Sequence, residues 1–122
     1  MKNLIVFLVA TSIILNACDA DKNDVICTEI FALVTIDVTG GDLDEHFTIR
    51  ISINDTIRPN QYTLNNSYTV LDDNYLPELR NSEDKFTFVG LIDKHVVISE
   101  EFVIKADECH IAKVSGADTI NL

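Results

Sequence analysis

Apolar and polar side chains alternate along much of the chain after residue 29, and this period of two is typical of β-strands with one buried face. The clearest stretch is residues 47–53 (FTIRISI), and its expected core face consists of Phe47, Ile49, Ile51 and Ile53. Residues 30–38 (IFALVTIDV) have the same spacing, with an expected core face of Ala32, Val34, Ile36 and Val38. Further candidate strands are residues 68–71, 86–92, 96–99, 101–105, 110–114 and 119–122.

Turn-forming residues separate these runs, and no apolar stripe of helical period is long enough to predict a helix among them. The main turn signals are Gly40-Gly41-Asp42, Asn54-Asp55, Arg58-Pro59-Asn60, Asn65-Asn66, Asp72-Asp73-Asn74 and Asp93-Lys94. The last of these stands between two apolar runs, as the tip of a hairpin would. About seven short strands in this arrangement predict an all-β antiparallel sandwich, with a small closed barrel as the alternative.

The N-terminus has a different pattern. Lys2 is followed by an uncharged, mostly apolar run over residues 4–15 and then by the small residues Ala17 and Cys18. A positive start, a short apolar run and small residues are the marks of a secretory signal peptide. As a helix, the run would measure about 18 Å, which is shorter than the roughly 30 Å of a bilayer's hydrocarbon core. We therefore predict a cleaved signal helix rather than a permanent membrane span.

The residues Leu15-Asn16-Ala17-Cys18 resemble the lipobox of bacterial lipoproteins, in which Leu and a small residue precede an obligatory Cys. The resemblance implies that the Cys18 thiol receives a diacylglyceryl group and that the chain is cut between Ala17 and Cys18. An ordinary cleaved signal with a Cys nearby is the alternative. The lipobox interpretation divides the chain into a signal peptide (residues 1–17), a lipidated tether (18–26) and a β-domain (27–122).

The tether begins with the polar and acidic residues 19–24 (DADKND), a composition typical of a flexible linker. Asp19, directly after the lipidated Cys, resembles the inner-membrane retention signal of enteric bacteria. Acidic residues in this position also resemble the surface-export signal of Bacteroidota lipoproteins. Both interpretations place the protein in the cell envelope, attached to a membrane through its N-terminal lipid.

The net charge of the mature chain indicates which classes of partner the protein can bind. Residues 18–122 are 105 in number, enough for one domain, and they carry eight basic and 20 acidic side chains, a net charge of −12. Such a charge repels phosphate backbones, and no basic cluster offsets it. The composition therefore excludes a nucleic-acid partner and is typical of a soluble exported domain.

The three cysteines fit the same compartment. If lipid occupies Cys18, then Cys27 and Cys109 are left to pair in an oxidising environment. Their bridge would close a loop of roughly 80 residues, worth on the order of 4 kcal/mol in the chain-entropy model. Two free buried thiols are the alternative.

Metal and catalytic chemistry find little support in the sequence. Cys109 and His110 are adjacent, so in a strand they point to opposite faces and can hardly share one zinc ion. His46 and His95 stand at strand starts and are expected on the surface. No Gly-x-Ser-x-Gly elbow occurs, and the acidic residues lie in predicted turns, where solvated carboxylates are normal. We therefore expect no enzyme, no metal and no cofactor.

Two acidic turns are the best candidates for contact with a partner. Asp42, Asp44 and Glu45 follow the first predicted strand, and Asp72, Asp73 and Tyr75 belong to a later turn. Loops at one end of a sandwich are its usual binding surface, and Tyr75 with Leu76 is the best exposed apolar candidate. The same carboxylates could bind calcium, although neither cluster matches an EF-hand loop.

The end of the chain carries a second resemblance. Residues 102–116 (FVIKADECHIAKVSG), with Cys109-His110 in an acidic turn, are similar to the ends of small Bacteroidota lipoproteins, which often also have a Cys ahead of the first strand, as Cys27 is here. Their domain resembles the carboxypeptidase-regulatory or transthyretin-like sandwich, a seven-stranded relative of the immunoglobulin fold. The resemblance implies a Cys27–Cys109 bridge and an outer-membrane setting. It brings no catalytic site.

Together these observations predict a membrane-anchored lipoprotein whose immunoglobulin-like domain is a non-enzymatic module that binds an envelope protein or a glycan. An accessory subunit of a larger outer-membrane complex is the alternative. A small calcium-binding or hydrolytic domain is a further one.

Overall fold

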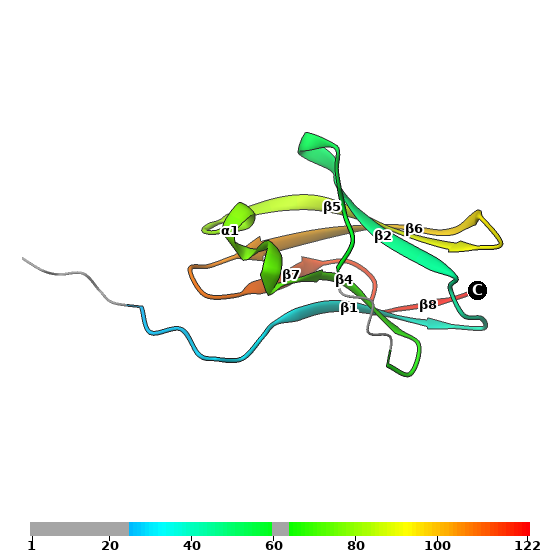
Figure 1. Ribbon diagram of the computed structural model, residues 1–122, viewed down its shortest axis with the longest axis horizontal. Coiled ribbons are helices and arrows are strands. Elements are labelled where there is room, and N and C mark those ends of the chain that lie inside the picture. The colour runs from blue at the N-terminus through cyan, green and yellow to red at the C-terminus, as the bar shows by residue number, and fades with distance from the viewer. Residues whose placement is uncertain (1–24, 60–63) are drawn as a thin grey trace, which may run out of the picture.

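Two facing β-sheets make up the computed structural model, which describes residues 25–59 and 64–122 (Figure 1). The predicted signal peptide, its cleavage site and Cys18 lie outside the described residues. Within them, no helix has both the length and the apolarity needed to cross a membrane. The two sheets are separate, so the domain is a β-sandwich and not a closed barrel.

The smaller sheet has the strand order β4-β1-β8. Strand β1 (Leu33–Thr39) is antiparallel to β4 (Ser67–Asp72) and parallel to β8 (Thr119–Asn121). Residues 30–32, predicted as the start of the first strand, lie outside it. The pairing of β1 with β8 starts only at Asp37, so residues 33–36 have no strand neighbour on that side within the described chain.

The larger sheet is antiparallel throughout, with the order β3-β2-β5-β6-β7. Its strands are β2 (Glu45–Arg50), β3 (Asp55–Ile57), β5 (Ser82–Ile92), β6 (His95–Ala106) and β7 (Ile111–Ser115). Two 3-10 turns, Ile51–Ile53 and Asp73–Tyr75, and the short helix α1 (Leu76–Leu79) complete the described elements.

The hydrophobic core lies between the sheets. Strand β1 contributes Val34, Ile36 and Val38, as the alternation predicted. The larger sheet contributes fully buried side chains of β5 and β6: Phe86, Phe88, Phe102 and Ile104. Because β1 buries one face against the larger sheet, the period-two pattern locates the core residues of this strand correctly.

Strand β2 corrects the sequence prediction in two ways. The strand ends at Arg50, and Ile51 and Ile53 are exposed in a turn that closes at Asn54, whose φ is +51°. Within the strand, the buried side chains are His46 and Thr48, so the predicted core face points outward. The reason is the inner neighbour of β2: the Thr48 hydroxyl donates to the Val70 carbonyl of β4 over 2.6 Å, a bond that an apolar side chain could not make.

Strands β5 and β6 form a hairpin, and β6 is longer than the sequence predicted. Asp93 and Lys94 form its tip with φ values of +49° and +64°, as expected for a tight hairpin turn. Residues 96–99 and 101–105 belong to the single strand β6. Gly90 lies opposite Ile98, and a Cβ there would stand 2.7 Å from the terminal Cδ1 methyl group of Leu43, so a larger residue would require the Leu43 side chain to move.

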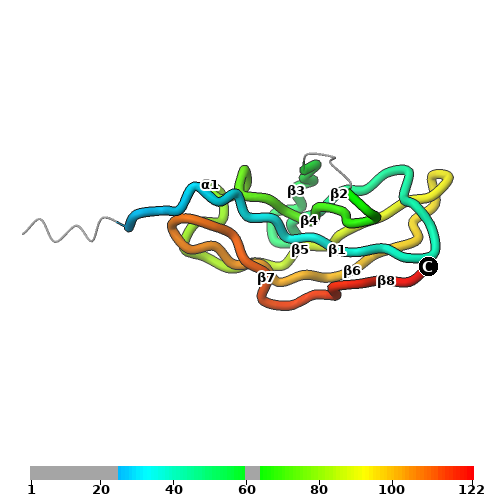
Figure 2. The backbone as a smooth tube through the Cα atoms, turned by 90° about the horizontal axis from the view of Figure 1, so that it is seen from below, coloured from blue at the N-terminus to red at the C-terminus, as the bar shows by residue number. Residues whose placement is uncertain are grey.

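The two ends of the sandwich hold different features (Figure 2). The chain enters at the end formed by α1 and the turn between β6 and β7, which we call the N-terminal end. The β1–β2 loop, the β5–β6 hairpin and the C-terminus lie at the opposite end, which we call the distal end.

Candidate functional site

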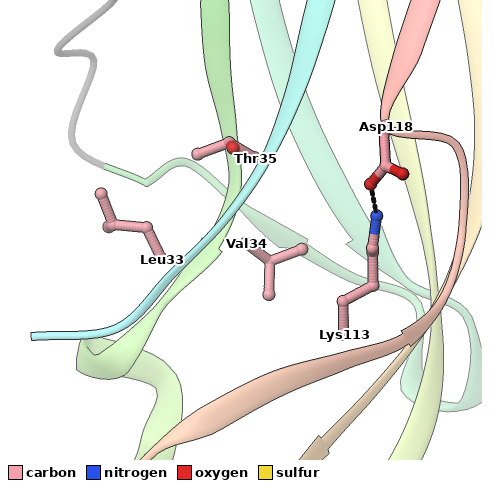
Figure 3. Close-up of a pocket in the computed structure, with 5 residues that line it drawn as sticks. All are labelled: Leu33, Val34, Thr35, Lys113 and Asp118. Atoms are coloured by element: carbon pink, nitrogen blue, oxygen red, sulfur yellow. Dashed lines mark hydrogen bonds and ion pairs between the residues drawn. The ribbon is translucent and has the colours of Figure 1, made fainter.

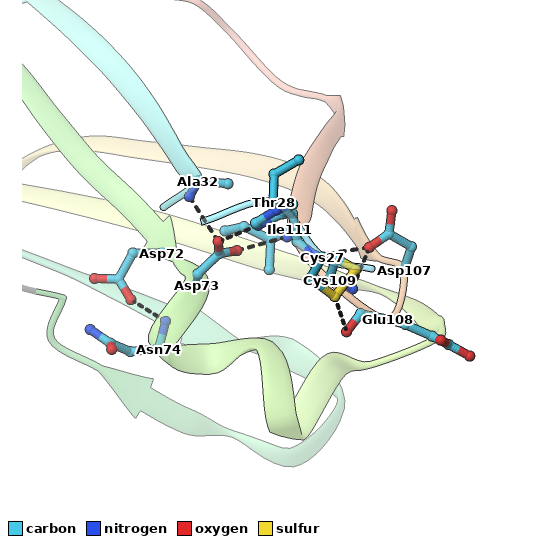
Figure 4. A network of polar contacts seen from close by, with 11 residues as sticks. Cys27, Thr28, Ala32, Asp72, Asp73, Asn74, Asp107, Glu108, Cys109 and Ile111 are labelled. Atoms are coloured by element: carbon cyan, nitrogen blue, oxygen red, sulfur yellow. Dashed lines mark hydrogen bonds and ion pairs between the residues drawn. A yellow bond between two sulfur atoms is a disulfide. The ribbon is translucent and has the colours of Figure 1, made fainter. Parts of the chain in front are cut away.

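A disulfide joins Cys27 to Cys109 at the N-terminal end (Figure 4). The two Cα atoms are 5.2 Å apart and the cysteines are 82 residues apart in sequence, which confirms the pairing predicted from the cysteine count. The bridge ties the segment that precedes β1 to the turn that precedes β7. The segments that lead into β1 and β7 are therefore joined covalently.

Asp73 lies beside this bridge and connects three parts of the chain. Its carboxylate accepts hydrogen bonds from Ala32 N (2.8 Å), Ile111 N (2.9 Å) and His110 Nδ1 (2.7 Å) (Figure 4). Burial alone raises the pKa of this carboxyl, but the hydrogen bonds from Ala32, His110 and Ile111 outweigh burial and hold the pKa below its ordinary value. Asp73 is therefore a structural acceptor between β4, β7 and the segment that enters β1.

His110 extends the same network. Its Nε2 lies 3.0 Å from the Thr28 hydroxyl. In the turn before it, Asp107 accepts from Cys109 N (2.7 Å) and His110 N (2.8 Å), and these two bonds lower the pKa of Asp107. The network thus holds the turn that carries Cys109. The His110 side chain is 26% exposed and is a half-buried part of this network.

The second predicted contact loop is not a free surface. Asp72 is buried, and its carboxylate caps the turn by accepting from Asn74 N over 2.9 Å. Tyr75 is half-buried, packs edge-on against Phe86 and donates its hydroxyl hydrogen to Asp55 over 3.2 Å. Leu76 packs on the core. The prediction that Tyr75 and Leu76 form an exposed apolar contact is therefore wrong.

The first predicted contact loop lies at the distal end, away from Asp72, Asp73 and Tyr75. Asp42 is exposed there and has no hydrogen bond within the described chain. Asp44 accepts from Asp93 N over 2.7 Å, which joins this loop to the β5–β6 hairpin, and Glu45 pairs with Arg58 over 3.0 Å. The structure thus separates the six predicted contact residues into two ends. Only Asp42, Asp44 and Glu45 share an accessible surface.

The described side chains of the kinds that bind metal ions lie apart from one another. Within residues 25–59 and 64–122, no three His, Cys, Asp or Glu side chains gather as a metal-binding group. Cys27 and Cys109 are consumed by their bridge, and Asp73 already accepts three hydrogen bonds. His95 is exposed, as predicted.

His46 is buried, contrary to the prediction of a surface position. It is 4% exposed, and it packs edge-on against Tyr68 at 5.1 Å between ring centres and against Phe88 at 5.7 Å. Its Nε2 has no hydrogen-bond partner within the described residues. Burial, together with the positive charge of Arg58, lowers its pKa, so the neutral ring is favoured. The alternation of the strand assigns His46 to the polar face, so the sequence contains no local signal that this side chain is buried.

A surface hollow of about 220 Å³ opens beside β1 (Figure 3). It is lined by Leu33, Val34 and Thr35 on one side and by Lys113 and Asp118 on the other, and the last two form an ion pair. Charge in the hollow is thus internally compensated, and its lining lacks a nucleophile–base pair of the kind that hydrolases use.

The segment before β1 exposes apolar side chains that the sequence prediction had assigned in part to a strand. The exposed residues are Val25, Ile26, Ile30, Phe31 and Leu33. The start of the predicted strand at residue 30 hid this feature, because an apolar residue at a strand start is ordinarily expected in the core.

The N-terminal end therefore combines a disulfide, a saturated carboxylate and an exposed apolar segment, and the distal end presents three exposed acidic side chains, Asp42, Asp44 and Glu45. Among residues 25–59 and 64–122, neither end brings together a set of side chains typical of one catalysed reaction. Searches against protein-family models, curated proteins and solved structures find no match to this chain.

Proposed function

We propose that the protein is a lipid-anchored, non-enzymatic module of a bacterial cell envelope. The observation that carries the proposal is the sequence Leu15-Asn16-Ala17-Cys18 directly behind the apolar run of residues 4–15. Lipid on Cys18 holds the mature chain on a membrane, since two or more acyl chains bind a bilayer stably whereas one binds it only marginally.

The Cys27–Cys109 disulfide supports export independently of the lipobox. Structural disulfides persist in oxidising compartments and are rare in the bacterial cytosol. The bridge also accounts for every cysteine of the chain, because the third one, Cys18, is the proposed acylation site. An exported chain with no spare thiol is what this assignment requires.

The similarity to small Bacteroidota lipoproteins with a transthyretin-like domain supports an outer-membrane location. The two-sheet architecture and the bridge between the segment before β1 and the turn before β7 are compatible with that domain. On this assignment the domain is a relative of the immunoglobulin fold, and such domains act chiefly as structural or binding modules.

The binding surface we propose is the distal end. Asp42, Asp44 and Glu45 lie there beside the β5–β6 hairpin, whose Val96 and Val97 are exposed. Loops at one end of a sandwich can contact a partner while the sheets hold them in place. The partner is an envelope protein or a glycan, and the distal end lies opposite the end at which the described chain begins.

A second role, as an accessory subunit docked on a larger envelope complex, is favoured by the outer face of the larger sheet. Phe47 and Val89 are paired across β2 and β5 on this face, and Ile49 lies beside them. Phe47 and Ile49 are half-buried, with the Arg58 guanidinium over the Phe47 ring, so part of this apolar strip is open to a protein partner.

Metabolic labelling with a fatty-acid analogue tests the anchor. The wild-type protein should incorporate label and lose residues 1–17, and the Cys18→Ala variant should incorporate none. The double variant Cys27→Ala/Cys109→Ala is the matched control, since it removes two cysteines and should keep the label. An unlabelled wild-type protein that retains its first 17 residues would overturn the proposal.

Site-specific photo-crosslinking in intact cells tests the binding surface. A crosslinker at Asp42 should capture a discrete envelope component, and one at Thr87, on the outer face of the larger sheet, should not. Capture from Thr87 alone would instead favour the accessory-subunit role.

A further inference from the structure

Five apolar side chains are exposed within residues 25–33, which lead into β1 and include its first residue. Ile26 is 92% exposed, Ile30 is 72% exposed and Phe31 is 53% exposed, and Val25 and Leu33 are each exposed by about half. We call residues 25–33 the entry segment. Single exposed apolar residues are ordinary on a protein surface, but a run of this density marks a surface that another phase or partner covers.

The entry segment is held in this position. The disulfide fixes Cys27 to the β6–β7 turn, and Thr28 contacts the ring of His110. Ala32 N donates to the Asp73 carboxylate at the other end of the segment. Ile30 and Phe31 lie between these attachments, and Ile26 directly precedes the disulfide; the core beneath β1 is already filled by other buried side chains.

The distance to the proposed anchor identifies what covers the segment. Seven residue steps separate Cys18 from Val25, and an extended chain spans at most about 3.6 Å per residue. Val25, the first residue of the entry segment, therefore stays within roughly 25 Å of the lipidated residue, whatever path the tether takes. It also lies at the N-terminal end of the sandwich, where the chain enters the domain (Figures 1 and 2).

We propose that the entry segment rests in the interface of the bilayer that carries the anchor, with Ile26, Ile30 and Phe31 among the lipid headgroups and upper acyl chains. This inference rests on the proposed lipid anchor and adds a second, non-covalent contact to it. Apolar and aromatic side chains gain from such burial in proportion to the area removed from water.

The acidic side chains at the N-terminal end of the sandwich determine which kind of lipid surface the entry segment can approach. Glu29, Asp107 and Glu108 are exposed at the same end, so an anionic membrane repels it and a zwitterionic one does not. The same acidic surplus disfavours a second copy of the chain as the occupant, because each copy carries a net charge of −12. The segment is thus matched to zwitterionic phospholipid.

The absence of tryptophan from the chain provides the test. The lipidated protein with Phe31→Trp is reconstituted into phosphatidylethanolamine–phosphatidylcholine vesicles, with and without lipids brominated on their acyl chains. Its emission should shift to shorter wavelength and be quenched by the brominated lipid. The matched control is Val96→Trp at the distal end, 59% exposed in the structure, whose emission should show neither effect.

The outcomes separate the anchor from the contact. A Phe31→Trp protein that floats with the vesicles while its emission behaves like that of the control overturns the entry-segment contact and leaves the anchor standing. A protein that does not float with them overturns both. Ile30→Trp serves as a second reporter if Phe31→Trp folds poorly. Quenching that strengthens when phosphatidylglycerol replaces half of the lipid would refute the charge argument.

Discussion

Replacing Asp73 with alanine should weaken the N-terminal end of the sandwich more than any other removal of a surface-loop carboxylate. The side chain accepts hydrogen bonds from Ala32 N, His110 Nδ1 and Ile111 N, which belong to segments 37 to 41 residues away in sequence. The Asp73→Ala variant leaves all three donors without this acceptor. The segment before β1 and the start of β7 then lose their common partner.

The expected cost follows from the two backbone donors. A buried donor left without a partner costs about 1–3 kcal/mol. Ala32 and Ile111 both lose one, and water reaches His110, whose side chain is 26% exposed, so its loss adds little. We expect the free energy of unfolding to fall by about 2–4 kcal/mol, a large share of the 5–15 kcal/mol typical of a domain.

The assay is urea unfolding of residues 19–122 with the disulfide intact, followed by far-UV circular dichroism. The matched control is Asp42→Ala, because Asp42 is an exposed loop carboxylate without a hydrogen bond in the described chain, and it should change stability by less than about 0.5 kcal/mol. Equal stability of Asp73→Ala and Asp42→Ala would refute the role assigned to Asp73.

The same pair of variants gives a pH test. The folded-state pKa of Asp73 lies below the ordinary 3.8. Its stabilising charge is therefore fully present above pH 3.8 and is lost as the pH falls through the lower folded value. The stability gap between wild type and Asp73→Ala should narrow over that acidic range. A gap that does not change with pH would show that the charge of Asp73 is not what the donors require.

Three further predictions concern the bridge, a glycine and the buried histidine. Cys27→Ala/Cys109→Ala should lower the free energy of unfolding by about 4.5 kcal/mol, the chain-entropy value for a loop of 82 residues, measured by urea unfolding. Gly116→Ala should cost about 2–3 kcal/mol, because its φ is +134° and a Cβ would stand 2.3 Å from buried Phe102. The folded-state pKa of His46 lies below 6.5. The contribution of the neutral ring to stability is therefore fully present above pH 6.5 and declines as the pH falls toward the folded-state pKa. The His46→Leu variant should flatten this decline, as measured by thermal unfolding.

Each of these has its own control. Reduced wild-type protein should match the double cysteine variant in midpoint, and an unchanged midpoint after reduction would contradict the entropic account. Gly41→Ala adds a Cβ at ordinary contact distance, 3.4 Å from Leu122, and should be nearly neutral. His95→Gln removes an exposed histidine and should keep the decline below pH 6.5. If the stability of His46→Leu still declines as the pH falls, other titratable groups cause the decline.

The sequence determined the class of fold and several local features by itself. Period-two alternation is a property of the extended backbone, so it identified β1 and its core residues Val34, Ile36 and Val38. Asp93 and Lys94 identified the hairpin because they stand between two apolar runs, and the structure gives both residues the positive φ of a tight turn. Counting cysteines left one intramolecular pair, Cys27 and Cys109, and the structure contains it.

Only the tertiary structure decided which face of β2 is inside. Alternation states which residues share a face, but the neighbouring sheet determines which face is covered. Here the inner neighbour is the edge of β4, whose Val70 carbonyl requires a donor, and Thr48 supplies one. His46 and Thr48 are therefore buried while Phe47 points outward, the reverse of what hydrophobicity alone predicts.

The candidate sites depended on the fold in the same way. Asp73 was recognisable as a turn residue, yet its partners are about 40 residues distant and no local pattern encodes them. The two acidic turns looked alike in sequence, but β4 runs antiparallel to β1 and carries the second turn to the opposite end of the sandwich. Local chemistry thus fixed the elements and the cysteine pair, whereas strand direction and the cover over each sheet decided which carboxylates are free and which apolar side chains meet water.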